Sequence, residues 1–247
     1  MKDGNMKRKL LAGAAAFVIV AAVVLGGIKL YRIHQMNQSG ILLAFDDYSE
    51  DSWRANFELF SEYGAKVTFF VNLSEPTEFC YDAEKEGHEI GFHTVEHVNL
   101  KEATEEAVYQ QAIAPIEVFR KEGIELTTFA YPYGAQTEQL DEMLLEHYNV
   151  VRGAYHLELH GKHELRKGFV DSMSLDNANF DSQEAYEQKI MEVLNELKGG
   201  KGRVASFYSH VIGDGEWCIS TDRLEFLLRK AKEMGLQFYT FQELQYW

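Results

Sequence analysis

Cysteine is scarce in this sequence, and its scarcity excludes two kinds of site. Cys80 and Cys218 are the only cysteines among 247 residues, and no C-x-x-C spacing occurs. A zinc ribbon and a thioredoxin-type redox centre are therefore excluded. We expect both cysteines to lie in loops. If the domain lies outside the cytoplasm, the two could form a disulfide, and the sequence does not decide whether they do. Such a bond requires Cα atoms within about 7 Å of each other.

Basic side chains are outnumbered. The chain has 24 Lys and Arg against 39 Asp and Glu, a net charge of −15. The first 39 residues hold six of the basic residues and one acid, so the remainder has a net charge of −20. A domain this acidic repels nucleic acid, and we predict no nucleic-acid partner. The acids are spread over helix faces, which is typical of solvated surface. Nothing in the sequence indicates an obligate protein partner.

Only one long hydrophobic run is present, near the amino terminus. Residues 10–28 are 19 uncharged, apolar residues, enough to cross a bilayer as a helix. Four basic residues precede the run, which predicts a cytoplasmic amino terminus. A cleaved signal peptide is the alternative, but the run exceeds the usual apolar length of such peptides and no A-x-A site follows it. No cysteine lies near its end, so a lipoprotein anchor is excluded.

These features predict a single-pass protein of the cell membrane with an extracytoplasmic domain. Residues 1–9 would be a cytoplasmic basic tail and residues 10–28 a transmembrane signal anchor. Residues 29–39 would be a juxtamembrane linker, and residues 40–247 the folded domain.

Beyond residue 40, short apolar runs alternate with helical periodicity. The runs predict strands at 41–45, 66–71, 88–92, 126–131, 150–155, 168–174, 203–208 and 237–241. The periodic segments predict helices at 52–63, 104–121, 137–147, 181–197 and 221–234. This order indicates one α/β domain with a mainly parallel sheet closed into a barrel.

Two adjacent acids follow the first predicted strand. Asp46 and Asp47 occupy its carboxyl end, in the stretch "LLAFDDYSED". A polar exit from a buried strand is one explanation. The other is chemistry, because active sites of parallel α/β folds collect at the carboxyl ends of strands.

Two histidines follow the third predicted strand. His93 and His97 are four residues apart, and on a helical turn both imidazoles would point the same way. Two imidazoles and one carboxylate would leave an open position on a divalent metal, Zn²⁺ first and Co²⁺ or Ni²⁺ as substitutes. The metalloprotease motif H-E-x-x-H is excluded, because Thr94 follows the first histidine.

Two further strand ends carry candidate residues. In "FAYPYG", Pro132 cannot donate a ladder hydrogen bond, so the strand stops there and its freed backbone can face a ligand. His210 follows another strand, where a lone histidine is either structural or catalytic.

The ordered set of motifs resembles the polysaccharide deacetylases, the NodB-homology group of carbohydrate esterase family 4. Phe45-Asp46-Asp47, the segment from His93 to His97, the segment from Tyr131 to Gly134, and Ser209-His210 carry the resemblance, which covers roughly residues 40–245. It implies a distorted (β/α)7 barrel and an acetylated polysaccharide as substrate.

The resemblance also implies a role for each motif residue. Asp46 would be the general base and His210 the general acid. Asp47, His93 and His97 would hold the metal. The backbone N–H near Tyr133 would help to bind the oxyanion, and Tyr131, Pro132 and Tyr133 would contact the substrate.

The sequence departs from the family pattern at several positions. Ala44 and Tyr48 stand where a Thr and a Gly are usual, and an Asp-x-x-Asp-Trp motif is missing. The Arg that usually pairs with the base is absent at Ala130 and its neighbours. In lacking this Arg, the chain resembles the subgroup that acts on extracellular poly-N-acetylglucosamine.

Other residues would replace the missing ones. We predict that Arg166 pairs with Asp46, with Lys167 and Arg152 as alternatives for the pair. The other interpretation of Arg166 is a cation on the surface. Asp171 or Asp176 would orient His210.

A second group of histidines, His156, His160 and His163, is spaced four and three apart. It predicts either a solvated loop or a second metal site.

The leading hypothesis is therefore a metal-dependent enzyme that removes acetyl groups from N-acetylated cell-surface or extracellular polysaccharide. An O-acetyl esterase of the xylan type is one alternative. A catalytically silent glycan-binding domain is the other, and the intact set of site residues opposes it.

Overall fold

A mainly parallel sheet forms the centre of the computed structural model, which describes residues 38–154, 159–161, 165 and 167–246. Its strands are β1 (Gly40–Asp46), β2 (Thr68–Val71), β3 (Glu89–Phe92), β4 (Thr128–Ala130), β5 (Val150–Gly153), β6 (Leu159–Gly161), β7 (Phe169–Asp171), β8 (Met173–Ser174), β9 (Arg203–Ser209) and β12 (Gln237–Tyr239). Their hydrogen-bonded order is β6-β9-β1-β2-β3-β4-β5-β7, with β12 beside β1 and β8 beside β9. Among the described strands of this sheet, only β6 pairs antiparallel.

One segment nearly closes this sheet into a barrel. Strand β7 pairs with β5, and β8, which follows directly, pairs with β9 near the opposite end of the strand order. Residues 169–174 therefore join the two edges of the sheet. The result agrees with the predicted barrel-like α/β architecture.

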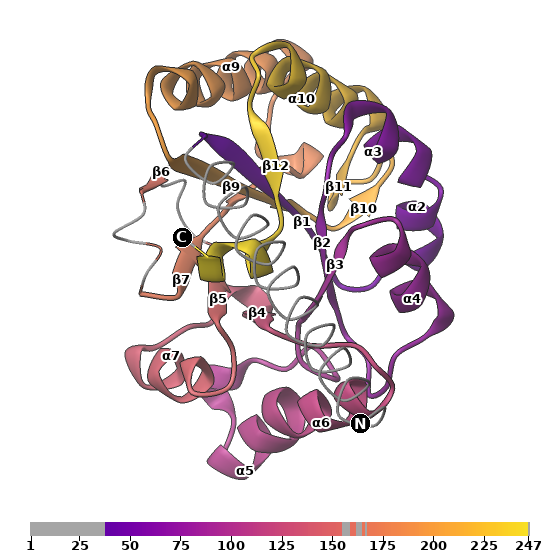
Figure 1. The fold of residues 1–247 in the computed structure, drawn as a ribbon, viewed down its shortest axis with the longest axis vertical. Coiled ribbons are helices and arrows are strands. Elements are labelled where there is room, and N and C mark those ends of the chain that lie inside the picture. Colours follow the sequence, from indigo (N-terminus) through magenta and orange to yellow (C-terminus); the bar gives the residue numbers. More distant parts are fainter. Residues whose placement is uncertain (1–37, 155–158, 162–164, 166, 247) are drawn as a thin grey trace, which may run out of the picture. The chain divides into compact units, whose positions relative to one another are not determined.

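Helices surround the strands (Figure 1). They are α2 (Glu50–Arg54), α3 (Phe57–Tyr63), α4 (Glu78–Lys85), α5 (Glu105–Val108), α6 (Ala114–Lys121), α7 (Glu138–Leu145), α9 (Gln183–Gly199) and α10 (Thr221–Glu233). Short helical turns η1 (Leu100–Glu102), η3 (Pro132–Gly134), η4 (Asn177–Asn179) and η5 (Phe241–Tyr246), and a π-helical turn η2 (Tyr109–Ile113), lie between them. Helices α9 and α10 pack side by side, and α2, α3 and α4 form another group (Figure 1).

The core lies between the sheet and these helices. Every residue of β1 is buried, as expected for a parallel strand covered on both faces. The rings of Phe45, Trp53, Phe69 and Phe79 pack together there, with Trp53 and Phe69 stacked at 5.0 Å. This cluster supports the end of β1 that carries Asp46.

The structure contains a strand at each of the eight predicted runs, but it divides two predicted helices. The helix predicted at 52–63 is interrupted at Asn56, whose side-chain amide donates to the carbonyl of Ser52 at 2.7 Å. The segment predicted at 104–121 contains the π-helical turn η2. Helix α4 and strands β6, β10 (Val211–Ile212) and β11 (Cys218–Ile219) were not predicted.

The predicted anchor and linker lie almost entirely outside the described residues. No helix in the described part of the chain is long and apolar enough to cross a membrane.

The cysteines do not form the disulfide that the sequence left open, and the expectation that both lie in loops was wrong. Both are free: Cys80 is buried within α4 and Cys218 lies in β11, so neither occupies a loop.

Candidate active site

The two adjacent acids differ because the backbone turns between them. Asp46 ends β1 and is 2% exposed. Asp47 has a φ of 72°, in the left-handed region, and its side chain is 41% exposed. The turn gives the two carboxylates different partners.

Left-handed backbone is concentrated in three loops. In the described part of the chain, the non-glycine residues with positive φ are Asp47, Tyr48, Thr94, His97 and Tyr133. Such conformations destabilise the backbone and persist only where the surroundings enforce them, which is common at functional sites. All three loops follow strands that the sequence had marked as candidate site positions.

Tyr48 shows how one such residue is held. Its φ is 54°, and the family usually has Gly at this position. The hydroxyl donates to Glu50 at 2.5 Å, and the ring meets Trp53 and Phe79 edge-on. These contacts stabilise a backbone conformation that residues other than glycine rarely adopt.

Asp47, His93 and His97 converge. Asp47 Oδ1 lies 3.2 Å from His93 Nε2 and 3.1 Å from His97 Nε2. Within the described residues they form the one group of metal-type ligands whose donor atoms lie close together. Burial alone would raise the pKa of Asp47, but the contacts with His93 and His97 hold it well below its usual range. Asp47 therefore remains an anionic donor.

The second hydrogen bond of His93 tests whether this group fits a cation. His93 Nδ1–H donates to the carbonyl of Ala130 at 2.8 Å, which leaves Nε2 as the ring atom that faces Asp47, 3.2 Å away. Metal-bound histidines commonly donate their other N–H in this way. The donor set therefore fits a divalent ion.

The loop that carries the histidines is not helical, which corrects one expectation. His93 and His97 converge because Thr94 and His97 adopt positive φ. Gln111 lies in the π-helical turn η2. Its backbone carbonyl accepts a hydrogen bond from the N–H of Val95 at 3.1 Å, and its side-chain Oε1 accepts one from the N–H of Glu96 at 2.9 Å. Functional sites are a frequent location of such turns.

Arg152 pairs with Asp46. Arg152 is fully buried and donates through Nη2 to Asp46 Oδ2. Its guanidinium lies over the rings of Tyr208 and Phe70, at 4.6 and 5.3 Å from their centroids. Asp46 Oδ1 is buried and has no hydrogen-bond partner in the described structure.

Arg152 was one of the two alternatives to Arg166, with Lys167, and it makes the contact with Asp46. Arg166 itself lies outside the described residues. In the sheet Arg152 is directly opposite Ala130, the position where the family's usual Arg is missing. A neighbouring strand therefore supplies the guanidinium.

His210 lies on the other side of Asp47. Its Nε2 is 3.7 Å from Asp47 Oδ2, and its Nδ1 is 2.8 Å from Asp176 Oδ2. Burial lowers the pKa of His210, but the bond to Asp176 and the nearby carboxylates outweigh burial and raise it. Of the two acids predicted to orient His210, Asp176 makes the contact, and it also accepts from Ser174 and Ser209.

The three predicted substrate-contact residues are placed differently from one another. Tyr131 is 1% exposed and donates to Asp141 at 2.7 Å, and Pro132 is buried, so both belong to the core. Tyr133 has a φ of 58° and is 64% exposed. Its ring centroid lies 4.5 Å from that of His97. Tyr133 is the member of this group that can meet a ligand.

Of the second histidine group, only His160 lies within the described residues. His160 is buried, and its Nε2 accepts the N–H of Asp171 at 3.2 Å. His156 and His163 lie outside the described residues. Lys167 is exposed on a turn.

Comparison with known proteins gives a match to a family profile and matches to curated relatives. A family profile described as polysaccharide deacetylase matches residues 34–149. A chitooligosaccharide deacetylase from Azorhizobium caulinodans is 36% identical over 116 residues, 44% of this chain and 54% of that protein. A gellan lyase from a Bacillus species is 34% identical over 119 residues, 45% of this chain and 4% of that protein. This chain thus aligns with about half or less of the length of these relatives.

Solved structures share the fold. A chitin deacetylase from Colletotrichum lindemuthianum has a TM-score of 0.60 at 16% identity, over 83% of this chain and 86% of that one. A peptidoglycan deacetylase from Bacillus subtilis has a TM-score of 0.58 at 21% identity, over 85% and 91%. An acetyl xylan esterase from Clostridium thermocellum, in complex with cobalt, has a TM-score of 0.57 at 19% identity, over 83% and 89%.

The profile match, the curated deacetylase relative and the shared fold lead to one conclusion. Over residues 34–149 the chain matches the polysaccharide deacetylase family, and the described domain shares the fold of solved carbohydrate deacetylases.

Proposed function

We propose that this protein is a metal-dependent hydrolase that removes acetyl groups from N-acetylglucosamine units of a cell-surface or extracellular polysaccharide. One observation carries the proposal. A buried acid with one oxygen held by Arg152 lies next to a carboxylate that meets two imidazoles, and a third imidazole faces the same carboxylate. This arrangement supports a general base, a metal site and a general acid in one place.

Asp47, His93 and His97 would hold the ion, and Zn²⁺ suits two imidazoles and a carboxylate best, with Co²⁺ or Ni²⁺ as substitutes. When bound, a divalent ion supplies Lewis acidity, which activates water and polarises a carbonyl.

Asp46 accepts the proton of the attacking water. Arg152 occupies Oδ2, which leaves Oδ1 as the acceptor and prevents the carboxylate from turning. The guanidinium also gives the buried carboxylate a partner of opposite charge.

His210 donates a proton to the leaving nitrogen. The water oxygen bonds to the acetyl carbon, the C–N bond breaks, and acetate and a free amine are released. Asp176 fixes the ring through Nδ1 and favours the protonated form, so that Nε2 faces the reaction. The backbone N–H near Tyr133 stabilises the negative charge on the carbonyl oxygen during attack.

The family's usual Arg is absent at Ala130, as in the subgroup that acts on poly-N-acetylglucosamine. This absence favours poly-N-acetylglucosamine as the substrate. The apolar run at residues 10–28 supports placement of the domain outside the cytoplasm, anchored to the membrane.

Hydrolysis of O-acetyl esters is the second candidate, because the same base and donor set serve an ester. The shared fold with an acetyl xylan esterase makes it a specific alternative. A silent glycan-binding domain would not require the buried pair of Asp46 and Arg152.

Acetate release from a panel of acetylated sugars tests the proposal. The purified full-length chain should release acetate from N-acetylglucosamine oligomers after zinc is added, and the Asp46→Asn variant should not. Release from acetylated xylan alone would favour the esterase. Binding without release would favour the silent domain.

A further inference from the structure

Arg223 is a buried cation that the proposed mechanism does not use. It lies in the first turn of α10 and is 8% exposed. Its Nε donates to Gln183 at 3.3 Å, and its Nη1 donates to the side-chain oxygen of Asn177 at 3.2 Å. The guanidinium also lies over the rings of Phe180 and Tyr186. A buried charge is costly unless its hydrogen bonds are made, so these neutral partners fix Arg223 against Asn177.

Asn177 connects two segments of the chain. It lies in η4, and its side-chain amide donates to the carbonyls of Gly213 at 3.3 Å and Gly215 at 3.0 Å, between β10 and β11. Its side-chain oxygen accepts from the N–H of Ser220 at 3.3 Å, just before α10. One side chain therefore joins η4 to both ends of the loop that leads from β10 to α10.

The same two segments carry the general acid and its partner. Asp176 directly precedes Asn177, and His210 directly precedes β10. Asp176 Oδ2 and His210 Nδ1 lie 2.8 Å apart. This contact spans the two segments that Asn177 joins, so a shift of either segment would separate the ring from the carboxylate.

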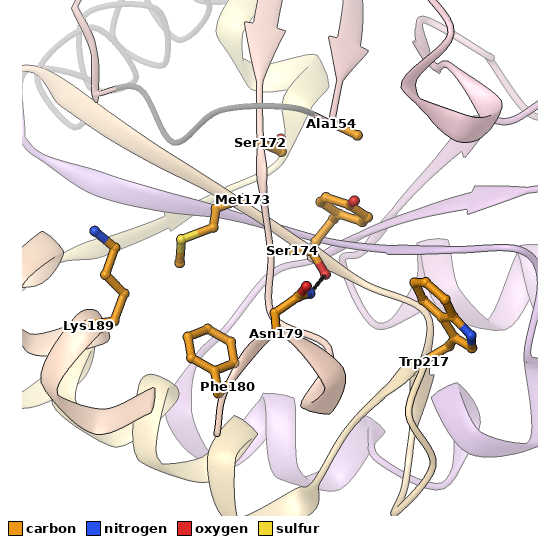
Figure 2. A pocket seen from close by; sticks show the side chains of 9 residues that line it. Ala154, Ser172, Met173, Ser174, Asn179, Phe180, Lys189 and Trp217 are labelled. Atoms are coloured by element: carbon orange, nitrogen blue, oxygen red, sulfur yellow. Dashed lines mark hydrogen bonds between the residues drawn. The ribbon is translucent and has the colours of Figure 1, made fainter. Parts of the chain in front are cut away.

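Other bonds set the direction of the Asp176 carboxylate. In Figure 2, Asn179 donates to Ser174 Oγ, at 2.8 Å, and Ser174 donates in turn to Asp176 Oδ2 at 2.8 Å. Ser209 donates to Asp176 Oδ1 at 2.6 Å. These three bonds do not reach the loop that follows His210, whereas those of Asn177 do.

Building on the proposed function, we propose that Asn177 and Arg223 are positioning residues for the general acid. Asn177 holds the segment of Asp176 against the segment of His210. Arg223 keeps the side chain of Asn177 in the orientation that makes these bonds, a task that suits the rigid, planar guanidinium. A displacement of about 1 Å at a catalytic group can cost about a hundredfold in rate, so residues that act only through His210 can control kcat.

The dependence of the rate on the leaving group tests this assignment. The zinc-loaded full chain is compared with Asn177→Ala on two substrates. The amine of an N-acetylglucosamine pentasaccharide must be protonated as it leaves, whereas the phenolate of para-nitrophenyl acetate leaves without a proton. We expect kcat for the pentasaccharide to fall about tenfold and KM to stay within about threefold. Hydrolysis of the phenyl ester should stay within about threefold, which would also show that the variant folds.

Two results would overturn the role of Asn177. One is an unchanged kcat for the pentasaccharide. The other is an equal loss on both substrates, because Asn177 would then support the fold or the metal site as a whole.

Arg223→Gln should show the same selective loss on the pentasaccharide, and Arg223→Lys, which keeps a donor and the charge, should restore part of the rate. Arg229→Gln is the matched control, because Arg229 lies on the same helix and pairs with Glu233 in a more exposed position. It should behave as the wild type does. Equal effects of Arg223→Gln and Arg229→Gln would overturn the role of Arg223.

A measurement without turnover separates this inference from the proposed function. Nuclear magnetic resonance of the full chain with isotope-labelled histidine gives the ring-nitrogen signals of His210, assigned by their loss in His210→Gln. Asp176→Asn gives the signals of a ring without the carboxylate, and those of Asn177→Ala should move towards them, even if no protein releases acetate. Signals of Asn177→Ala identical to those of the wild type would overturn the assignment whatever the activity.

Discussion

Two buried acids on the same sheet differ in how completely their partners satisfy them. Glu89 begins β3 and Asp46 ends β1, and each is 2% exposed. Glu89 accepts from Thr68 at 2.7 Å, from Thr128 at 2.5 Å and from the N–H of Gln242 at 3.0 Å. Asp46 is bound by Arg152 through one oxygen, and its other oxygen has no partner in the described structure.

The difference assigns separate tasks to the two ends of the barrel. At the amino ends of the strands, Glu89 ties three strands and the turn η5 together with uncharged donors, and burial raises its pKa despite those bonds. At the carboxyl ends, the chain holds a carboxylate opposite a guanidinium and uses left-handed backbone in three loops. A buried acid whose oxygens all accept hydrogen bonds stabilises the fold. A buried acid that has an oxygen without a hydrogen-bond partner, next to other titratable groups, can accept a proton in a reaction.

The largest effect is expected at Asp46. Asp46→Asn keeps the shape of the side chain and an oxygen for Arg152, but it cannot take a proton. We expect kcat for acetate release to fall about 10³-fold, as for loss of a general base. Circular dichroism should show that the variant folds. Activity within about tenfold of wild type would mean that another group is the base.

Glu89→Ala should show the opposite pattern. Its three donors would be left buried and unpaired, and we expect the free energy of unfolding to fall by about 3 kcal/mol. Urea unfolding measures this loss. Acetate release per folded molecule should stay within about threefold, because Glu89 lies at the other end of the strands. Loss of activity without loss of stability would contradict the division between the ends.

A smaller effect is expected when the partner of Asp46 is changed. Arg152→Lys keeps the positive charge but loses the planar fork, so Asp46 is held less well and kcat should fall about thirtyfold. Arg166→Ala is the comparison. It should leave kcat within about threefold, because Arg152 already forms the pair. The reverse ranking would restore Arg166 as the partner.

The smallest effect concerns pH. His88 is buried against Phe57, Phe60 and Phe69, and burial lowers its pKa from 6.5 to about 4. The unfolded chain binds a proton first as the pH falls, so this contribution to stability is complete above pH 6.5 and is lost towards pH 4. Between pH 6.5 and 5 the loss should be about 1.5 kcal/mol.

The His88→Asn variant retains an acceptor for the N–H of Val67 but no titrating ring. Its free energy of unfolding should fall less over the same pH interval, measured by urea unfolding at each pH. Parallel curves for the two proteins would show that His88 does not titrate in this range.

Much of the fold could be predicted from the sequence, because buried parallel strands are continuous apolar runs such as those of β1 and β2. The convergence of Asp47, His93 and His97 was also predictable, since the carboxyl ends of parallel strands meet at one edge. Helix α4 was missed because only eight residues give too little periodicity.

Details that depend on strand register were not predictable. Arg152 meets Asp46 because β5 sets it opposite Ala130, and no local pattern ranks it above Arg166. Tyr131 enters the core while Tyr133 turns outward at a positive φ, although both belong to one motif. The choice of Asp176 over Asp171 likewise depends on the pairing of β8 with β9.

Zinc affinity tests the central claim most directly, because the claim gives the two adjacent acids different tasks. Isothermal titration calorimetry would compare the chelator-treated wild type with Asp46→Asn and Asp47→Asn. We predict that the wild type and Asp46→Asn each bind about one ion with similar affinity, and that Asp47→Asn binds at least about a hundredfold more weakly. Unchanged zinc affinity in Asp47→Asn, or its loss in Asp46→Asn, would contradict the assignment of ligand and base.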